Sequence, residues 1–171
     1  MEHQGSSTKL DGTGAGAVSA NEQLLTFIVD GEEYGVDILR VQEIRSWSNP
    51  MPIPNTPHYI KGVINIRGDV VAIADLRERL GLPRLNYGAT TVIVVLRVGG
   101  GGHERVMGVI VDAMSDVTNV PQAAIKPPPT FKNSHEGGLA KGIVTLENKM
   151  ITILDVDLIF DVSSASLVPA A

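Results

Sequence analysis

The sequence predicts a mostly β protein of two pseudo-symmetric β-barrels that pack side by side, with a few short helices. Between residues 22 and 162 the apolar residues come in short runs separated by Gly, Pro, Asn and Asp, which is the pattern of strands and turns. The same pattern occurs twice along the chain, which indicates two copies of one small β unit. Because a short open sheet leaves its edges unpaired, we expect each copy to curl into a barrel.

An internal repeat defines the two copies. Residues 34–44 resemble residues 107–117, and residues 61–76 resemble residues 141–156. We therefore expect a single domain with two interleaved barrel subdomains.

The expected domain covers residues 22–162, and its subdomains cover about residues 22–85 and 88–162. Residues 1–21 and 163–171 are rich in small residues and are expected to be loose or disordered tails.

Three hairpins and one helix are predicted within the repeat. The hairpins pair apolar runs across short turns: residues 24–29 with 34–38, 60–66 with 70–74, and 92–98 with 105–111. Asp75 has the position of an N-cap before a short helix at residues 76–80, which Gly81 and Pro83 end.

Composition excludes several classes of function. The chain of 171 residues has no cysteine, so disulfides, thiolate metal sites, thiol catalysis and iron–sulfur clusters are not expected. Its net charge of -5, without clustered Lys and Arg, argues against nucleic-acid binding. No secretory signal and no apolar run of ~20 residues is present, so we expect a cytoplasmic protein that does not insert into the membrane. Its partners are expected to be proteins.

The sequence contains no nucleotide-binding motif, no metal-ligand spacing among its histidines, and no Gly-x-Ser-x-Gly motif of serine hydrolases. We therefore expect no cofactor, no metal and no enzymatic activity. A remote alternative is a pseudo-symmetric β hydrolase that uses the matched pair Asp75 and Asp155, as in aspartic proteases. The residues that follow each Asp do not fit that class, and both carboxylates are explained as N-caps.

The two copies differ at one hairpin tip. Residues 65–69 read Asn-Ile-Arg-Gly-Asp, whereas residues 145–149 read Thr-Leu-Glu-Asn-Lys. Arg67 is either a solvated side chain at a turn or a functional cation, and Glu43 either pairs with it, pairs with a partner, or is a plain surface residue. Trp47 is expected to be a half-buried anchor.

Several motifs resemble those of the CheW-like domain family of chemotaxis coupling proteins. The resemblance spans about residues 23–162, and the Asn-Ile-Arg-Gly turn is its most specific part. The motifs lie at residues 33–44, 57–68, 75–77, 111–117 and 125–127.

The resemblance implies two five-stranded, SH3-like β-barrels without a catalytic site. It implies an adaptor that couples the cytoplasmic tip of methyl-accepting chemoreceptors to the regulatory domain of the histidine kinase CheA. The protein would be recruited to the inner face of the membrane through receptor arrays. An alternative within the same family is a scaffold of a non-chemotaxis pathway that controls motility or a second messenger.

The resemblance also implies site residues. The receptor would lie in the groove between the barrels, near Val41, Ile44, Gly62, Arg67 and Gly108. The kinase or neighbouring array members would contact Glu43, Asn65, Arg67 and Phe131, and Glu43 and Arg67 match a charged pair of the family. Ile66 and Ala72 depart from the residues usual at those positions.

Overall fold

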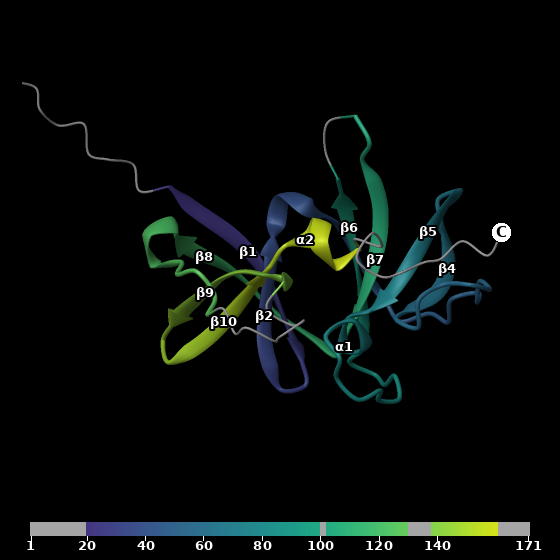
Figure 1. The fold of residues 1–171 in the computed structure, drawn as a ribbon, viewed down its shortest axis with the longest axis horizontal. Coiled ribbons are helices and arrows are strands. Elements are labelled where there is room, and N and C mark those ends of the chain that lie inside the picture. The colour runs from purple at the N-terminus through teal and green to yellow at the C-terminus, as the bar shows by residue number, and fades with distance from the viewer. Residues whose placement is uncertain (1–19, 100–101, 130–137, 161–171) are drawn as a thin grey trace, which may run out of the picture.

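The computed structural model describes residues 20–99, 102–129 and 138–160 (Figure 1). In these ranges the strands are β1 (Asn21–Val29), β2 (Glu32–Asp37), β3 (Val41–Ser46), β4 (Ile60–Ile66), β5 (Asp69–Asp75), β6 (Val92–Val98), β7 (Arg105–Val111), β8 (Ala113–Pro121), β9 (Ala140–Leu146) and β10 (Lys149–Leu154). The helices are α1 (Leu76–Arg79) and α2 (Val156–Ile159), with 3-10 turns η1 (Ile38–Arg40) and η2 (Gln122–Ala124).

The strands form two five-stranded sheets that lie side by side in Figure 1. One has the order β3-β6-β7-β5-β4 and the other the order β8-β1-β2-β10-β9. The two orders match position by position, and the numbers of the two strands at each position differ by five. For example, β3 in the first sheet corresponds to β8 in the second. In both sheets the third and fourth strands of this order are parallel, β7 with β5 and β2 with β10. The predicted class of two pseudo-symmetric five-stranded units is confirmed.

Each sheet is closed by one isolated bridge. Met51 follows the edge strand β3 and bonds to Val63 on the opposite edge strand β4, with N–O distances of 2.9 Å in both directions. Lys126 follows the edge strand β8 and bonds to Ile143 on β9 in the same way, at 2.9 and 2.8 Å. We call the unit of β3 to β7 barrel 1, and the unit of β1, β2 and β8 to β10 barrel 2.

The barrels do not follow the two halves of the chain. The expected bounds of about 22–85 and 88–162 put β1 and β2 with β3 to β5, whereas these strands pair with β8 and β10. Between β1 and β10, the described part of the chain crosses from one barrel to the other through η1 after β2 and through Asp112 after β7. The expected bounds are wrong because β2 pairs in parallel with β10, and a local hairpin can provide only antiparallel pairs.

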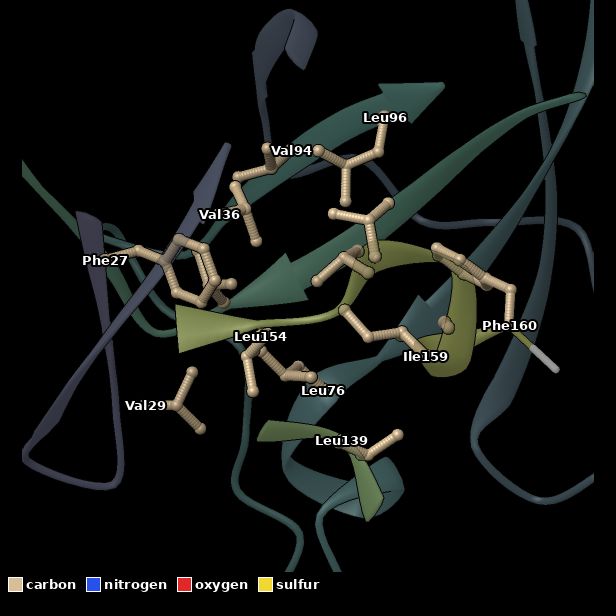
Figure 2. Packing of buried hydrophobic residues seen from close by; sticks show 14 of the residues in the cluster. Phe27, Val29, Val36, Leu76, Val94, Leu96, Leu139, Leu154, Ile159 and Phe160 are labelled. Atoms are coloured by element: carbon tan, nitrogen blue, oxygen red, sulfur yellow. The ribbon is translucent and has the colours of Figure 1, made fainter. Parts of the chain in front are cut away.

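The described residues form a hydrophobic core with three parts. One buried cluster fills the inside of barrel 1 and another fills barrel 2, while the largest lies between them (Figure 2). On β6, Ile93 and Val95 belong to the inside of barrel 1, and Val94 and Leu96 belong to the cluster between the barrels. Side chains alternate across a strand, so an apolar run such as β6 supplies both cores.

The predicted hairpins and the predicted helix are present in the described residues. Asp75 Oδ1 accepts a hydrogen bond from the backbone N of Arg77 at 2.9 Å, so it is the N-cap of α1. Asp155 caps α2 in the same way through the backbone N of Asp157 at 3.0 Å. Trp47 is half-buried, as expected, and its ring centroid lies 4.0 Å from that of Tyr87. The described helices include none that is long and apolar enough to cross a membrane.

Candidate partner-binding site

The turn between β4 and β5 holds Arg67 at its tip. Asn65 Oδ1 accepts a hydrogen bond from the backbone N of Gly68 at 2.9 Å. Arg67 and Gly68 have positive φ values of 51° and 91°, as in the two-residue turns that suit twisted hairpins. The side chain of Arg67 is 75% exposed. The turn therefore presents a cation to solvent from a defined backbone.

Glu43 on β3 pairs with this cation. The distance from Glu43 Oε2 to Arg67 Nη2 is 2.8 Å, and Glu43 Oε1 accepts from Arg45 Nη1 at 3.1 Å. The Glu43 side chain is only 16% exposed. Because β3 and β4 are opposite edges of the sheet, the pair spans the seam at which barrel 1 closes. Of the alternatives open for Glu43, the structure selects the pair with Arg67.

Barrel 2 has the same turn geometry without this pair. Glu147 and Asn148 take positive φ values of 47° and 65° at the tip of the β9–β10 hairpin. The repeat aligns Glu147 with Arg67 and Asp116 with Glu43, so two acidic residues replace the ion pair. The seam of barrel 1 that the Glu43–Arg67 pair spans, which we call the charged seam, therefore distinguishes barrel 1 from barrel 2.

Two predicted receptor contacts, Gly62 and Gly108, are buried. Gly62 has a φ of 140°, and a Cβ at this position would overlap the carbonyl oxygen of Met51. A Cβ on Gly108 would lie 2.5 Å from Cδ1 of the buried Ile73 and 2.9 Å from Cγ2 of the buried Ile93. Both glycines permit close packing inside barrel 1 and offer little surface to a partner.

The remaining predicted receptor contacts on β3, Val41 and Ile44, share one face. A register shift between Val41 and Glu43 pairs Val41 with Leu96 and Ile44 with Val94, and both of these partners belong to the core between the barrels. Glu43 pairs with Val95, which belongs to the inside of barrel 1. Val41 is half-buried and Ile44 is 45% exposed, so the structure groups these two residues and places the Glu43–Arg67 pair on the other face of β3.

An apolar surface beside Asn65 was missed in the sequence. Met51 is 67% exposed and Val70 is 72% exposed, and both line a hollow of about 480 Å³. The available signal was Val70 itself, an apolar residue at an outward position of β5 next to the buried Val71. We call Met51, Val63, Ile64 and Val70 the apolar patch; Asn49 and Asn65 complete the lining. Exposed apolar surface with a polar rim is typical of protein-binding sites.

Comparison with known proteins decides the family. The family profile described as "CheW-like domain" matches residues 23–164. The chain belongs to the CheW-like domain family. The chemotaxis protein CheW of Klebsiella aerogenes is 36% identical over 150 residues, which cover 88% of each chain. The chemotaxis protein CheW of Bacillus subtilis is 33% identical over 153 residues, which cover 89% of this chain and 96% of the relative.

A solved structure of a CheW-like protein has the same fold. The scaffolding protein TtCheW from Thermoanaerobacter tengcongensis superimposes with a TM-score of 0.75 at 29% identity. The match covers 83% of this chain and 94% of TtCheW.

The two aspartates of the remote hydrolase alternative have structural contacts in this CheW-like domain. Asp75 is buried, and its two oxygens accept from the Arg77 backbone and the Tyr87 hydroxyl, the latter at 2.7 Å. Burial and this hydrogen bond raise the pKa of Tyr87 well above its ordinary value. Asp155 accepts from the second residue of α2. Within residues 20–99, 102–129 and 138–160, no three His, Asp or Glu side chains gather to hold a metal ion.

Phe131, the expected aromatic contact of the array, lies outside the described residues. Its role stays a prediction from the family resemblance.

Proposed function

We propose that this chain is a non-enzymatic scaffold that couples chemoreceptors to the histidine kinase CheA in chemotaxis. Its membership of the CheW-like domain family supports the proposal, as does its similarity to relatives named chemotaxis proteins and to a solved scaffolding protein. The observation that carries it in the structure is the apolar patch directly beside the turn that the Glu43–Arg67 pair holds.

The apolar patch suits the kinase side of the scaffold. Val70 and Met51 offer area that a partner can desolvate, and Asn65 lies at the rim. We assign the regulatory domain of CheA to this patch, and we keep Glu43 and Phe131 as further kinase or array contacts. Apolar anchors inside a polar rim are the usual anatomy of specific interfaces.

The receptor side would use the charged seam of barrel 1 and its neighbours. Arg67 supplies an exposed cation, and Val41 and Ile44 supply apolar side chains on the face of β3 that borders the core between the barrels. Gly62 and Gly108 contribute indirectly, because they fix the strands that carry this surface.

Modest interfaces of this kind become effective through multivalency. Each contact alone is expected to be weak, and a lattice of receptors and kinases raises the effective concentration of the next contact. We therefore place the working protein in the cytoplasm, recruited to the inner face of the membrane by receptor arrays. The signal would pass as a change in relative packing and not as a chemical step.

Titration calorimetry tests the proposal with the isolated regulatory domain of CheA and, separately, with a receptor cytoplasmic fragment. Val70→Asp should weaken kinase binding at least about tenfold, because it puts a charge into a desolvated contact. Met150→Asp is the matched control, since Met150 is the equivalent residue of barrel 2 and is also exposed, at 60%. Arg67→Glu should weaken receptor binding.

Two outcomes would overturn the proposal. One is an absence of binding to both partners by the folded wild-type protein. The other is equal binding by wild type, Val70→Asp and Arg67→Glu, with circular dichroism spectra that are unchanged.

A further inference from the structure

Two polar clusters join the barrels at pseudo-equivalent positions. The Arg77 cluster consists of Arg77 in α1, Asp30 in the β1–β2 turn, and Asp112 between β7 and β8. Arg77 Nη1 lies 2.8 Å from Asp112 Oδ2, and Arg77 Nη2 lies 2.8 Å from Asp30 Oδ1. Asp112 Oδ2 also accepts from the backbone N of Asp30 at 2.8 Å. The helix that follows β5 of barrel 1 is thereby tied to a turn of barrel 2.

The Arg40 cluster consists of Asp157 in α2, Gly99 at the end of β6, and Arg40 between β2 and β3. Arg40 Nη2 lies 2.7 Å from Asp157 Oδ2. Asp157 Oδ1 accepts from the backbone N of Gly99 at 2.7 Å. Arg40 Nη1 donates to the carbonyl oxygens of Arg97 and Gly99 at 3.0 and 3.1 Å.

The two clusters have the same plan with opposite charges. Arg77 and Asp157 are each the second residue of a short helix, and Asp112 and Arg40 each directly precede the strand that enters the other barrel. Each of these helix residues also contacts a residue at a strand connection of the other barrel. Arg77 contacts Asp30, and Asp157 contacts Gly99. The clusters are therefore two ties across one junction, related by the pseudo-symmetry of the fold.

The arginines of the two clusters differ in how far their side chains are buried. The Arg77 side chain is 6% exposed and donates a further hydrogen bond from Nε to the carbonyl oxygen of Pro83 at 3.0 Å. Arg40 and Asp157 are 31% and 44% exposed. An exposed ion pair contributes less to stability and is screened by salt, whereas a buried guanidinium that loses its partners is strongly unfavourable.

The crossing segments and the packing differ in the same direction. Asp112 alone separates β7 from β8, whereas three residues of η1 separate β2 from β3, and Leu39 among them is 79% exposed. A hollow of about 170 Å³ lies beside the Arg40 cluster, lined by Asp37, Arg40, Lys141 and residues 154–157. The Arg77 side of the junction thus has a short crossing and a buried guanidinium, and the Arg40 side has a longer crossing and an exposed ion pair.

The C-terminal end of α2 has a separate attachment. Arg79 of α1 donates from Nε to the carbonyl oxygen of Ile159 at 2.9 Å and from Nη2 to that of Leu158 at 3.1 Å. Ile159 is also fully buried in the cluster between the barrels. Any opening on this side is therefore confined to η1, the N-terminal end of α2 and the end of β6.

We propose that the barrel junction is a one-sided hinge, in which the Arg40 cluster opens locally while the Arg77 cluster stays closed as the fixed point. Such a device lets the two barrels shift relative to each other on the Arg40 side, where Val98 and Val156 of the core between them would move, while the rest of that core stays packed. The inference is independent of the proposed partners.

Amide hydrogen exchange measured by NMR tests the hinge, because each cluster contains one reporter amide. The amide of Gly99 bonds to Asp157, and the amide of Asp30 bonds to Asp112. We expect Arg40→Gln to speed exchange at Gly99 about two- to fivefold, as for loss of an exposed ion pair, and to leave exchange at Asp30 unchanged. Asp157→Asn keeps an acceptor for Gly99 and should have the same selective effect.

The control is Arg97→Gln, which removes an exposed positive charge on the neighbouring strand without removing the backbone carbonyl that Arg40 uses. This variant should leave the exchange rates of the Gly99 and Asp30 amides unchanged. Raising the salt concentration from 0.1 to 1 M should speed exchange at Gly99 only, since the Debye length falls from about 10 to about 3 Å. Equal acceleration of both amides by Arg40→Gln, or acceleration of neither, would overturn the hinge.

Discussion

The hydroxyl of Tyr87 donates a hydrogen bond to the buried carboxylate of Asp75, with an oxygen–oxygen distance of 2.7 Å. The ring of Tyr87 in turn stacks on Trp47, the single tryptophan of the chain. The N-cap of α1 is therefore connected through Tyr87 to the segment that follows β3. This connection gives the start of α1 a built-in spectroscopic reporter.

Tyr87→Phe should lower the free energy of unfolding by about 1–3 kcal/mol, because it leaves Asp75 Oδ2 buried without its donor. Urea unfolding followed by Trp47 fluorescence measures this change. Thr90→Val is a suitable control, since Thr90 donates an exposed hydrogen bond to the Asp112 carbonyl and should matter less. An unchanged free energy of unfolding in Tyr87→Phe would contradict the structural role of this hydrogen bond.

Alkaline pH should destabilise the protein through the same tyrosine. Burial and the bond to Asp75 raise the pKa of Tyr87 in the folded state above the ordinary value of 10.0. Above that value the unfolded chain releases the phenolic proton and the folded chain keeps it, so stability falls as pH rises. Comparing the ultraviolet titrations of wild type and Tyr87→Phe should assign to Tyr87 a phenol that ionises only well above its ordinary pKa. Ionisation of Tyr87 near its ordinary value would contradict the expected environment.

Gly62→Ala should be far more destabilising than Gly142→Ala at the equivalent site of barrel 2. A Cβ on Gly62 meets the Met51 backbone and requires a φ of 140°, whereas a Cβ on Gly142 first meets the Ile125 side chain at 2.6 Å. We expect Gly62→Ala to cost more than about 2 kcal/mol, from backbone strain at this seam. Thermal unfolding of the two variants compares the sites, and a smaller loss for Gly62→Ala would refute this account of the seam.

Arg67→Ala should change the free energy of unfolding by less than about 1 kcal/mol, because the side chain is 75% exposed and its ion pair is partly screened. Any loss of receptor binding in this variant is then a surface effect and not a folding defect. Denaturant unfolding beside the binding assay separates the two. A loss of several kcal/mol would reassign Arg67 to a structural role.

Acid should weaken the Arg40 cluster. The Gly99 amide and the Arg40 guanidinium lower the pKa of Asp157 below its ordinary value of 3.8. Its contribution to stability is therefore complete above that value and is lost as pH falls through the lower folded-state pKa. Asp157→Asn should be less stable than wild type near pH 7, and the difference should disappear at strongly acidic pH. A difference that is independent of pH would contradict the assignment.

Local features of the fold were predictable from the sequence because short-range chemistry determines them. Asp75 as an N-cap, the β4–β5 turn and the half-buried Trp47 each follow from residue type and near neighbours. The pair of Glu43 with Arg67 was one of several open alternatives, and closure of barrel 1 selects it.

The long-range features were not predictable in the same way. The parallel pairing of β2 with β10 joins segments that are far apart in the chain, and no turn motif signals it. The exposure of Met51 depends on the bridge that closes barrel 1, and the exposure of Val70 depends on its outward-facing position on β5. Likewise, the sequence predicts Gly108 as a receptor contact, whereas in the structure Ile73 and Ile93 fill the space beside it.

The exchange of strands between the barrels has a consequence for biosynthesis. All strands of barrel 1 come from one uninterrupted stretch, from Val41 to Val111, whereas barrel 2 needs β1 and β2 together with β10 near the other end. As the ribosome delivers the chain, barrel 1 has its full set of strands first, and the β1–β2 hairpin waits for β8 to pair with β1 and for β10 to pair with β2. During that interval both edges of the hairpin are open, and an open edge can pair with another chain.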